Sequence, residues 1–177
     1  MVARQPGVKL WLIGRDATDK ATGATSTWSL MQNSFTPEAL AQTQYFGSIP
    51  YEQVKKYIHD AAVCVFPSFA EALPLSWMEA MACGKPLVVT DIGWAKEIVD
   101  DNVNGFLVSP NTHDLYAEKI LFLLDNPKQC LQFGRAAREK VEASFSTEVI
   151  ADKNVDWYSN VLAKGVSRKR SLLDDIF

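Results

Sequence analysis

The stretch from Val63 to Thr90 constrains the fold of this chain more than any other segment, because its pattern reads strand, loop, helix, strand. The sequence of the stretch is VCVFPSFAEALPLSWMEAMACGKPLVVT. A short apolar run is followed by a helical pattern that begins after Pro74, and Gly84 and Pro86 separate that helix from a second apolar run. This order of elements predicts a βαβ unit with two parallel strands.

Two glutamates lie in this unit in different settings. Glu71 follows the first strand in a loop, and Glu79 lies eight positions later, within the otherwise apolar helix. Burying a carboxylate among apolar side chains is unfavourable unless a polar group meets it. Ligands of α/β folds bind at the carboxyl ends of the strands, which favours a binding site near these residues. The alternatives are an exposed loop carboxylate for Glu71 and a solvent-facing helix position for Glu79.

The rest of the chain repeats the alternation of short apolar runs and helical patterns. Strands are predicted at residues 8–13, 44–46, 63–66, 87–90 and 106–108. Helices are predicted at residues 28–31, 37–41, 50–62, 75–83, 94–99, 112–125, 127–144 and 147–164. This order predicts an α/β fold with one Rossmann-like parallel sheet of about five or six strands and flanking helices. The loops expected to share the carboxyl rim of that sheet are residues 14–16, 47–50, 67–74 and 91–96.

Composition excludes several classes of function. A chain of 177 residues, 47% hydrophobic and 22% charged, is typical of one globular domain. Its net charge of -3 offers no basic field for nucleic acid. The three scattered cysteines indicate reduced thiols in a cytosolic protein. His59 and His113 have no ligand partner at metal spacing, so no metal site is predicted.

The sequence also bears on the relation of the chain to membranes. It has no apolar stretch as long as a transmembrane helix, and its N-terminus does not read as a signal peptide, so a cytoplasmic location is expected. The one basic run is Arg168-Lys169-Arg170, near the C-terminus. Such a run is usually a solvated tail, and the alternative is a peripheral contact with the inner face of the plasma membrane.

The segment EALPLSWMEAMACGKPLVVTD, which begins at Glu71, resembles the donor-binding motif of the retaining glycosyltransferases of family 4, also called group 1. The family motif usually reads E-G-[LF]-[GP]-x-x-x-x-E-A-M-A-x-G-x-P-V-V-A-[TS]. The clear departure is Ala72, where the family usually has glycine. The resemblance continues through IGWAKEIVDDNVNGFLVSP and YFGSIPYEQVKKYIHDAAVCVFPS, and covers most of residues 8–162. It implies the C-terminal, donor-binding half of a GT-B fold, in which two Rossmann-like domains flank the active site.

The resemblance implies separate roles for the two glutamates. Glu71 would accept hydrogen bonds from hydroxyls of the donor sugar, and it is the candidate catalytic residue through binding and electrostatics rather than as an established nucleophile. Glu79 would accept from the two ribose hydroxyls of the nucleotide. A carboxylate has two oxygens and can therefore accept both donors of a cis-diol.

Backbone groups near the start of the helix complete one side of the predicted site. Ala72, Leu73, Leu75 and Ser76 lie where the free amides and the dipole of a helix N-terminus suit a diphosphate or a sugar oxygen. Pro74 has no N–H, so the donors would be Leu73, Leu75 and Ser76. The alternative is an ordinary strand-to-helix turn. If the position of Ala72 requires a positive φ, alanine is strained there; otherwise the loop differs slightly from that of the family.

Two other rim loops contribute candidates. The resemblance implies that the backbone of Ile49 meets the nucleobase, although a hydrophobic residue closing a loop explains it equally well. Gly14 would allow close approach of the ligand or of a partner domain. Arg15 and Lys96 are rim cations that either face a phosphate or are solvated, and Trp94 either walls the sugar pocket or packs.

The resemblance implies a fragment of a retaining hexosyltransferase. Residues 1–165 would form the donor domain without its first strand–helix unit, residues 166–177 would be a tail, and the N-terminal acceptor domain would be absent. The whole enzyme would transfer a hexose from a UDP- or GDP-linked sugar to a glycan or lipid-linked acceptor in cell-surface polysaccharide synthesis. It would need no cofactor and no metal, and this chain alone would be inactive. The alternatives are a non-catalytic nucleotide-sugar binding module, and a related nucleotide-sugar epimerase or phosphorylase.

Overall fold

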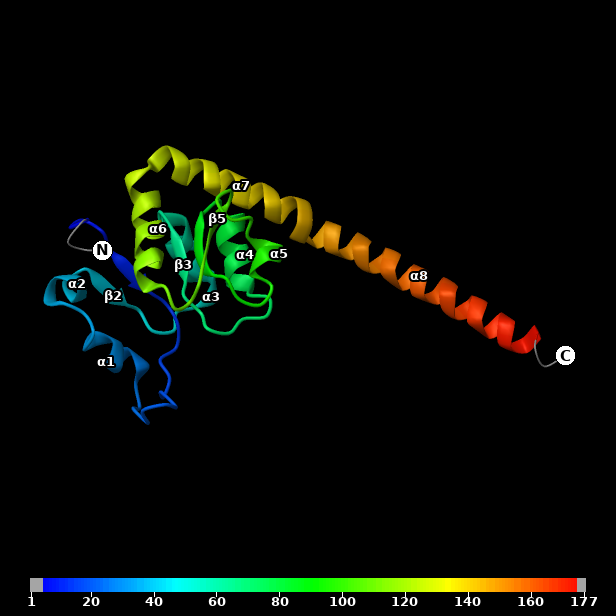
Figure 1. Ribbon diagram of the computed structural model, residues 1–177, viewed down its shortest axis with the longest axis horizontal. Coiled ribbons are helices and arrows are strands. Elements are labelled where there is room, and N and C mark those ends of the chain that lie inside the picture. Colours follow the sequence, from blue (N-terminus) through cyan, green and yellow to red (C-terminus); the bar gives the residue numbers. More distant parts are fainter. Residues whose placement is uncertain (1–4, 175–177) are drawn as a thin grey trace.

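The computed structural model describes the backbone of residues 5–174 and the side chains of residues 5–164. Its elements, in chain order, are β1 (Leu10–Leu12), α1 (Thr27–Gln32), α2 (Pro37–Ala41), β2 (Thr43–Tyr45), α3 (Tyr51–Asp60), β3 (Cys64–Phe66), α4 (Leu75–Ala82), β4 (Leu87–Thr90), α5 (Ala95–Ile98), β5 (Gly105–Val108), α6 (His113–Asp125), α7 (Pro127–Phe145) and α8 (Thr147–Asp174) (Figure 1). The predicted alternation is therefore confirmed, and most element ends lie within one or two residues of the prediction.

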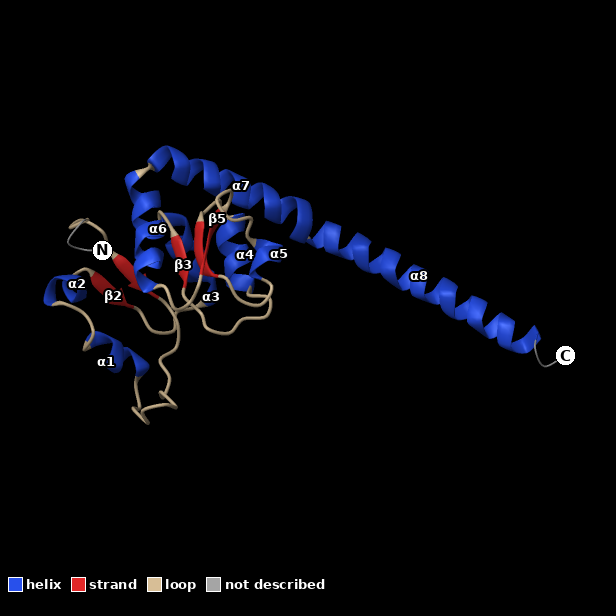
Figure 2. Ribbon diagram, in the orientation of Figure 1, coloured by secondary structure: helices blue, strands red, loops and turns tan. Residues whose placement is uncertain are grey.

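The strands are parallel, but they form two hydrogen-bonded sheets rather than the single sheet that the sequence predicts. β1 pairs with β2, and β3, β4 and β5 form the second sheet in that order (Figure 2). Among the described residues, β1 bonds to no strand except β2, and β3 to no strand except β4. Within the described part of the chain, no hydrogen-bonded ladder therefore joins β1 or β2 to the sheet of β3, β4 and β5.

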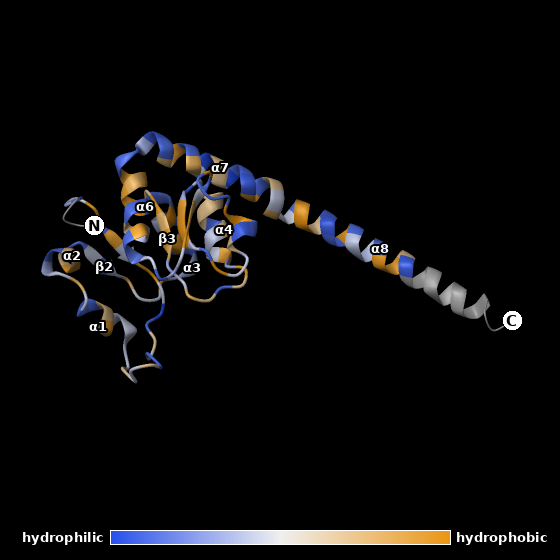
Figure 3. Cartoon of the chain, in the orientation of Figure 1, coloured by the Kyte–Doolittle hydropathy of each residue, from blue (hydrophilic) through white to orange (hydrophobic). Residues whose placement is uncertain are grey.

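The hydrophobic core lies around β4, and helices cover both faces of its sheet. Successive side chains of a strand point to opposite faces. Leu87 and Val89 pack with Trp77, Met81 and Ile98 in one cluster. The side chain between them, Val88, packs in a second cluster whose other buried members are Phe106, Val108, Tyr116, Leu123 and Phe133. The sheet is therefore sandwiched between α4 and α5 on one face and α6 on the other, as predicted (Figure 3).

Helix α3 joins the two sheets. The ring of Tyr57 lies edge-on to Trp11 of β1, with centroids 5.7 Å apart, and 4.6 Å from the ring of Phe46. On the same helix, Ile58 packs against the cluster that contains Trp77. None of the described residues from 5 to 63 is buried, so this aromatic contact forms at a half-exposed surface.

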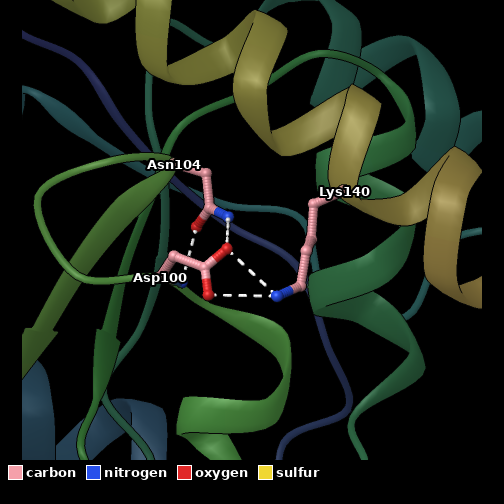
Figure 4. Close-up of polar contacts among 3 residues, drawn as sticks. All are labelled: Asp100, Asn104 and Lys140. Carbon is pink, nitrogen blue, oxygen red and sulfur yellow. Dashed lines mark hydrogen bonds and ion pairs between the residues drawn. The ribbon is translucent and has the colours of Figure 1, made fainter.

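A polar cluster ties the loop before β5 to α7, away from the carboxyl rim (Figure 4). The side-chain oxygen of Asn104 accepts a bond from the backbone N–H of Asp100 at 3.0 Å, and its amide donates to the Asp100 carboxylate at 3.2 Å. Lys140 of α7 lies 3.0 Å from both oxygens of that carboxylate. Because Asn104 is 1% exposed, these bonds satisfy a polar side chain in the core.

The last helix projects from the rest of the chain (Figure 1). The pattern predicts that it ends at residue 164, whereas α8 runs to Asp174. The side chains of the basic run Arg168-Lys169-Arg170 lie outside the described residues. Within the described part of the chain, no helix combines the length and the apolar character needed to cross a bilayer. The cysteines are free thiols, as predicted, and burial raises the pKa of Cys64 to about 12.

Candidate functional site

The predicted rim loops contact one another in two pairs. The backbone N–H of Gly14 donates to the carbonyl of Gly47 at 3.0 Å, which joins the loops after β1 and β2. The hydroxyl of Thr90, at the end of β4, donates to the carbonyl of Ser68 at 2.6 Å, which joins the ends of β3 and β4. Because the strands within each sheet are parallel, these contacts lie at the carboxyl ends, where the sequence predicts the site.

Glu71 lies in the loop between β3 and α4 and is half-buried. The hydroxyl of Ser68 donates to its Oε1 at 2.8 Å. The carbonyl of the same serine accepts from Thr90, whose side chain is buried. The Glu71 carboxylate is therefore connected to the core strand β4 through two hydroxyl groups. The sequence reasoning missed Ser68 and Thr90, although a serine three residues before a glutamate in a loop is a usable signal.

Gly93 allows the loop after β4 to approach the backbone of Glu71. Its φ is +51°, and a Cβ built on it would lie 2.5 Å from the carbonyl oxygen of Glu71. Any other residue would therefore combine a left-handed backbone with a collision against main-chain atoms. The sequence reasoning did not single out Gly93, which helps to hold the Glu71 loop in place.

Glu79 lies on α4 beside Ala80 and Met81, which are fully buried, and its carboxylate has a polar partner. The phenol of Tyr51, the first residue of α3, donates to Glu79 Oε1 at 2.6 Å. The hydrogen bond, together with the negative charge of Glu79, raises the pKa of Tyr51. Glu79 is half-buried and is therefore not the freely solvated helix residue of the alternative interpretation. The sequence reasoning missed Tyr51.

The N-terminus of α4 lies between the two glutamates in the chain. No described residue accepts a hydrogen bond from the backbone N–H of Leu73, Leu75 or Ser76, and no side chain caps the helix. Free amides at a helix N-terminus suit an anion or a sugar oxygen. Among the described residues, Asn102 is the one non-glycine with a positive φ, so Ala72 is accommodated without left-handed strain.

Gly14 and Ile49 lie toward β1 and β2. Gly14 lines a cavity of about 270 Å³, together with Arg15, Trp28 and Tyr45, and neither glutamate lines that cavity. Ile49 is half-buried in the loop that precedes Tyr51. Ile49 thus lies two residues before Tyr51, which bonds to Glu79, whereas Gly14 belongs to a separate hollow of the rim. Their ligand contacts stay predictions.

The remaining rim candidates differ in their surroundings. Lys96 pairs with Asp91 at 3.2 Å. Trp94 is 59% exposed, so it is not packed into the core. Phe69, Leu73 and Leu75 are also large apolar side chains that are exposed along this rim. Among the described residues, no three His, Cys, Asp or Glu side chains are grouped to hold a metal ion.

Comparison with known sequences identifies similar proteins. The profile of a family described as "Glycosyl transferases group 1" matches residues 4–140. The chain is 31% identical over 121 residues to alpha-maltose-1-phosphate synthase of Mycolicibacterium smegmatis, which covers 65% of this chain and 31% of that protein. It is 26% identical over 157 residues to glycogen synthase of Mycobacterium tuberculosis, covering 89% of this chain and 38% of that protein. The chain thus spans roughly a third of the length of these relatives.

Comparison with solved structures gives the same architecture. Sucrose-phosphate synthase from Thermosynechococcus elongatus superposes with a TM-score of 0.77 at 28% identity, covering 92% of this chain and 41% of that chain. Anabaena HepE in complex with UDP-glucose superposes with a TM-score of 0.75 at 22% identity, covering 88% and 42%. The second likeness shows the fold alone. Both neighbours are GT-B glycosyltransferases, so the fold class predicted from the sequence is confirmed.

Proposed function

Because this chain belongs to the group 1 glycosyltransferases, we propose that its carboxyl rim binds a nucleotide-diphosphate sugar as the donor for hexosyl transfer with retention of configuration. In this proposal Glu79 accepts hydrogen bonds from the ribose hydroxyls, and Glu71 accepts them from hydroxyls of the sugar. The N-terminus of α4 stabilises the leaving diphosphate, since free N–H groups and the helix dipole favour negative charge.

The observation that carries the proposal is the matched environment of the two carboxylates. Each is half-buried, and each accepts a hydrogen bond from a hydroxyl at one oxygen: Ser68 for Glu71, and Tyr51 for Glu79. No described residue donates to the second oxygen of either carboxylate. Sugar and ribose offer the same hydroxyl donors, so both sites suit ligands rich in hydroxyl groups.

The acceptor is proposed to bind through a further domain. The relatives that the chain matches are more than twice its length, and the exposed Phe69, Leu75 and Trp94 beside Glu71 suit contact with another protein surface. Among the similar proteins are a glycogen synthase and a poly(ribitol-phosphate) alpha-N-acetylglucosaminyltransferase of Staphylococcus aureus, which supports a glycan acceptor and a role in polysaccharide synthesis. The chain alone is then expected to bind donor without transferring it, because donor and acceptor are not aligned.

Calorimetry with UDP, GDP and their glucose conjugates tests the proposal. The chain should bind one nucleotide series in the range of about 0.1–1 mM. Glu79→Ala should weaken binding of the nucleoside diphosphate by about 1–3 kcal/mol, because a charged acceptor for two hydroxyls is lost. Glu71→Ala should leave that affinity nearly unchanged but should remove any additional affinity for the sugar conjugate.

Glu148→Ala is the matched control, since this exposed glutamate lies on α8, away from the rim. It should bind like the wild type. Equal affinities of the wild type and Glu79→Ala would remove Glu79 from the site. A loss of nucleoside diphosphate affinity in Glu71→Ala alone would show that the proposed roles are reversed.

A further inference from the structure

Tyr51 occupies a position that packing does not explain. Its side chain is 70% exposed, yet its hydroxyl lies 2.6 Å from Glu79 Oε1. The residue begins α3 directly after Pro50, where the loop after β2 ends. The contact therefore links this loop to α4, across 28 positions of sequence. An exposed aromatic side chain gains little from burial here, so the hydrogen bond is its main specific contact.

The bond restricts a carboxylate that no other described side chain holds. A glutamate side chain has three rotatable bonds, and ordering it lowers its conformational entropy. A bond from Tyr51 to one oxygen fixes the carboxylate before a ligand arrives. A carboxylate has about four lone-pair sites, so this single bond leaves room on both oxygens for two further donors.

The phenol keeps its proton at neutral pH. The bond to Glu79 and the charge of Glu79 both raise the pKa of Tyr51, so the hydroxyl donates throughout the neutral range. Tyr51 therefore remains a donor under the conditions in which a nucleotide would bind. Ser68 provides the corresponding bond to Glu71, so both glutamates of the rim are oriented by a hydroxyl group.

We propose that Tyr51 is a positioning residue that orients the Glu79 carboxylate for the ribose cis-diol and so determines selectivity for ribonucleotides over 2′-deoxyribonucleotides. The inference rests on the proposed function and adds a specificity-determining residue to it. Tyr51 acts through Glu79. Its loss should therefore weaken only the recognition of the hydroxyls, whereas a general distortion of the rim would weaken binding of every nucleotide.

Calorimetry with two matched pairs of nucleotides, UDP with dUDP and GDP with dGDP, tests the inference. The wild type should bind one ribonucleotide about 10-fold more tightly than its 2′-deoxy form, because one hydroxyl contact is missing. Tyr51→Phe should bind that ribonucleotide about 3- to 10-fold more weakly and should weaken the deoxynucleotide less, because the deoxynucleotide keeps only one of the two hydroxyl contacts with Glu79. In a Glu79→Gln background, Tyr51→Phe should have no further effect on selectivity.

Tyr158→Phe is the control, since Tyr158 is 61% exposed on α8. It should leave all affinities unchanged. If Tyr51→Phe weakens both members of a pair equally, leaves both unchanged or strengthens ribonucleotide binding, the positioning role is wrong while the proposed function stands. If the wild type binds none of the four nucleotides, the proposed function fails, and the inference fails with it.

Discussion

The two parts of this chain, the first with the sheet of β1 and β2 and the second with the sheet of β3, β4 and β5, differ in packing, although both contribute to the carboxyl rim. None of the described residues from 5 to 63 is buried, whereas all four residues of β4 and most of the side chains around them are 0–2% exposed. The first part supplies Tyr51 and the cavity around Gly14, and the second supplies both glutamates and the N-terminus of α4. The groups proposed to hold sugar, diphosphate and ribose therefore lie on a well-packed framework, whereas Tyr51, which is proposed to orient Glu79, lies on a loosely packed one.

The cause of the difference is the number of neighbours rather than the sequence of each strand. Residues 8–13 and 87–90 are both short apolar runs. β4 lies between two strands and between two layers of helices, whereas β1 bonds to β2 alone among the described strands and is covered by the half-exposed ring of Tyr57. An apolar run therefore indicates a strand, while the burial of that strand depends on which elements surround it.

The largest expected effect is a difference in stability between two identical substitutions. Leu87→Ala in β4 should lower the free energy of unfolding by about 2–5 kcal/mol, because it opens a cavity in the core. Leu10→Ala in half-buried β1 should lower it by only about 1 kcal/mol. Urea denaturation followed by circular dichroism measures both. Equal losses would contradict the assignment of the core to the second part.

A smaller loss of stability is expected where the loop after β4, at Gly93, meets the loop that carries Glu71. Gly93→Ala should destabilise the protein by about 2–3 kcal/mol, because a strained backbone is combined with a collision at the Glu71 carbonyl. Gly23→Ala is the matched control: its φ is +76°, but a Cβ there has open space, so about 1 kcal/mol is expected. Thermal unfolding measures the difference in stability between the two variants. If their melting temperatures are equal, Gly93 does not hold the Glu71 loop.

Much of the fold was predictable because its signals are local. Thr36 accepts a bond from the N–H of Ala39, as its position before Pro37 predicts, and β4 has the bounds that its apolar run gives. The division into two sheets was not predictable, since periodicity does not report which strands are neighbours. The extension of α8 beyond residue 164 was also missed, because Gly165 reads as a helix stop, whereas the helix continues past it.

The candidate site was predictable in part. The motif located Glu71, Glu79 and the turn into α4, and the structure gives these residues a common rim with free amides between them. Tyr51 and Gly93 were missed because each acts through a contact with a residue more than 20 positions away. Such contacts depend on how loops from different strands meet, which a sequence pattern does not encode.

Hydrogen–deuterium exchange, with and without UDP-glucose or GDP-glucose, shows whether the well-packed part and the loosely packed part share one ligand site. Without ligand, amides of β4 and β5 should exchange on the order of 100-fold more slowly than those of β1 and β2. With the bound ligand, protection should increase in residues 47–51 and 71–79 together, and not in the loop at residues 100–104 on the opposite side. Equal exchange in the two sheets, or ligand protection confined to one part, would contradict the account.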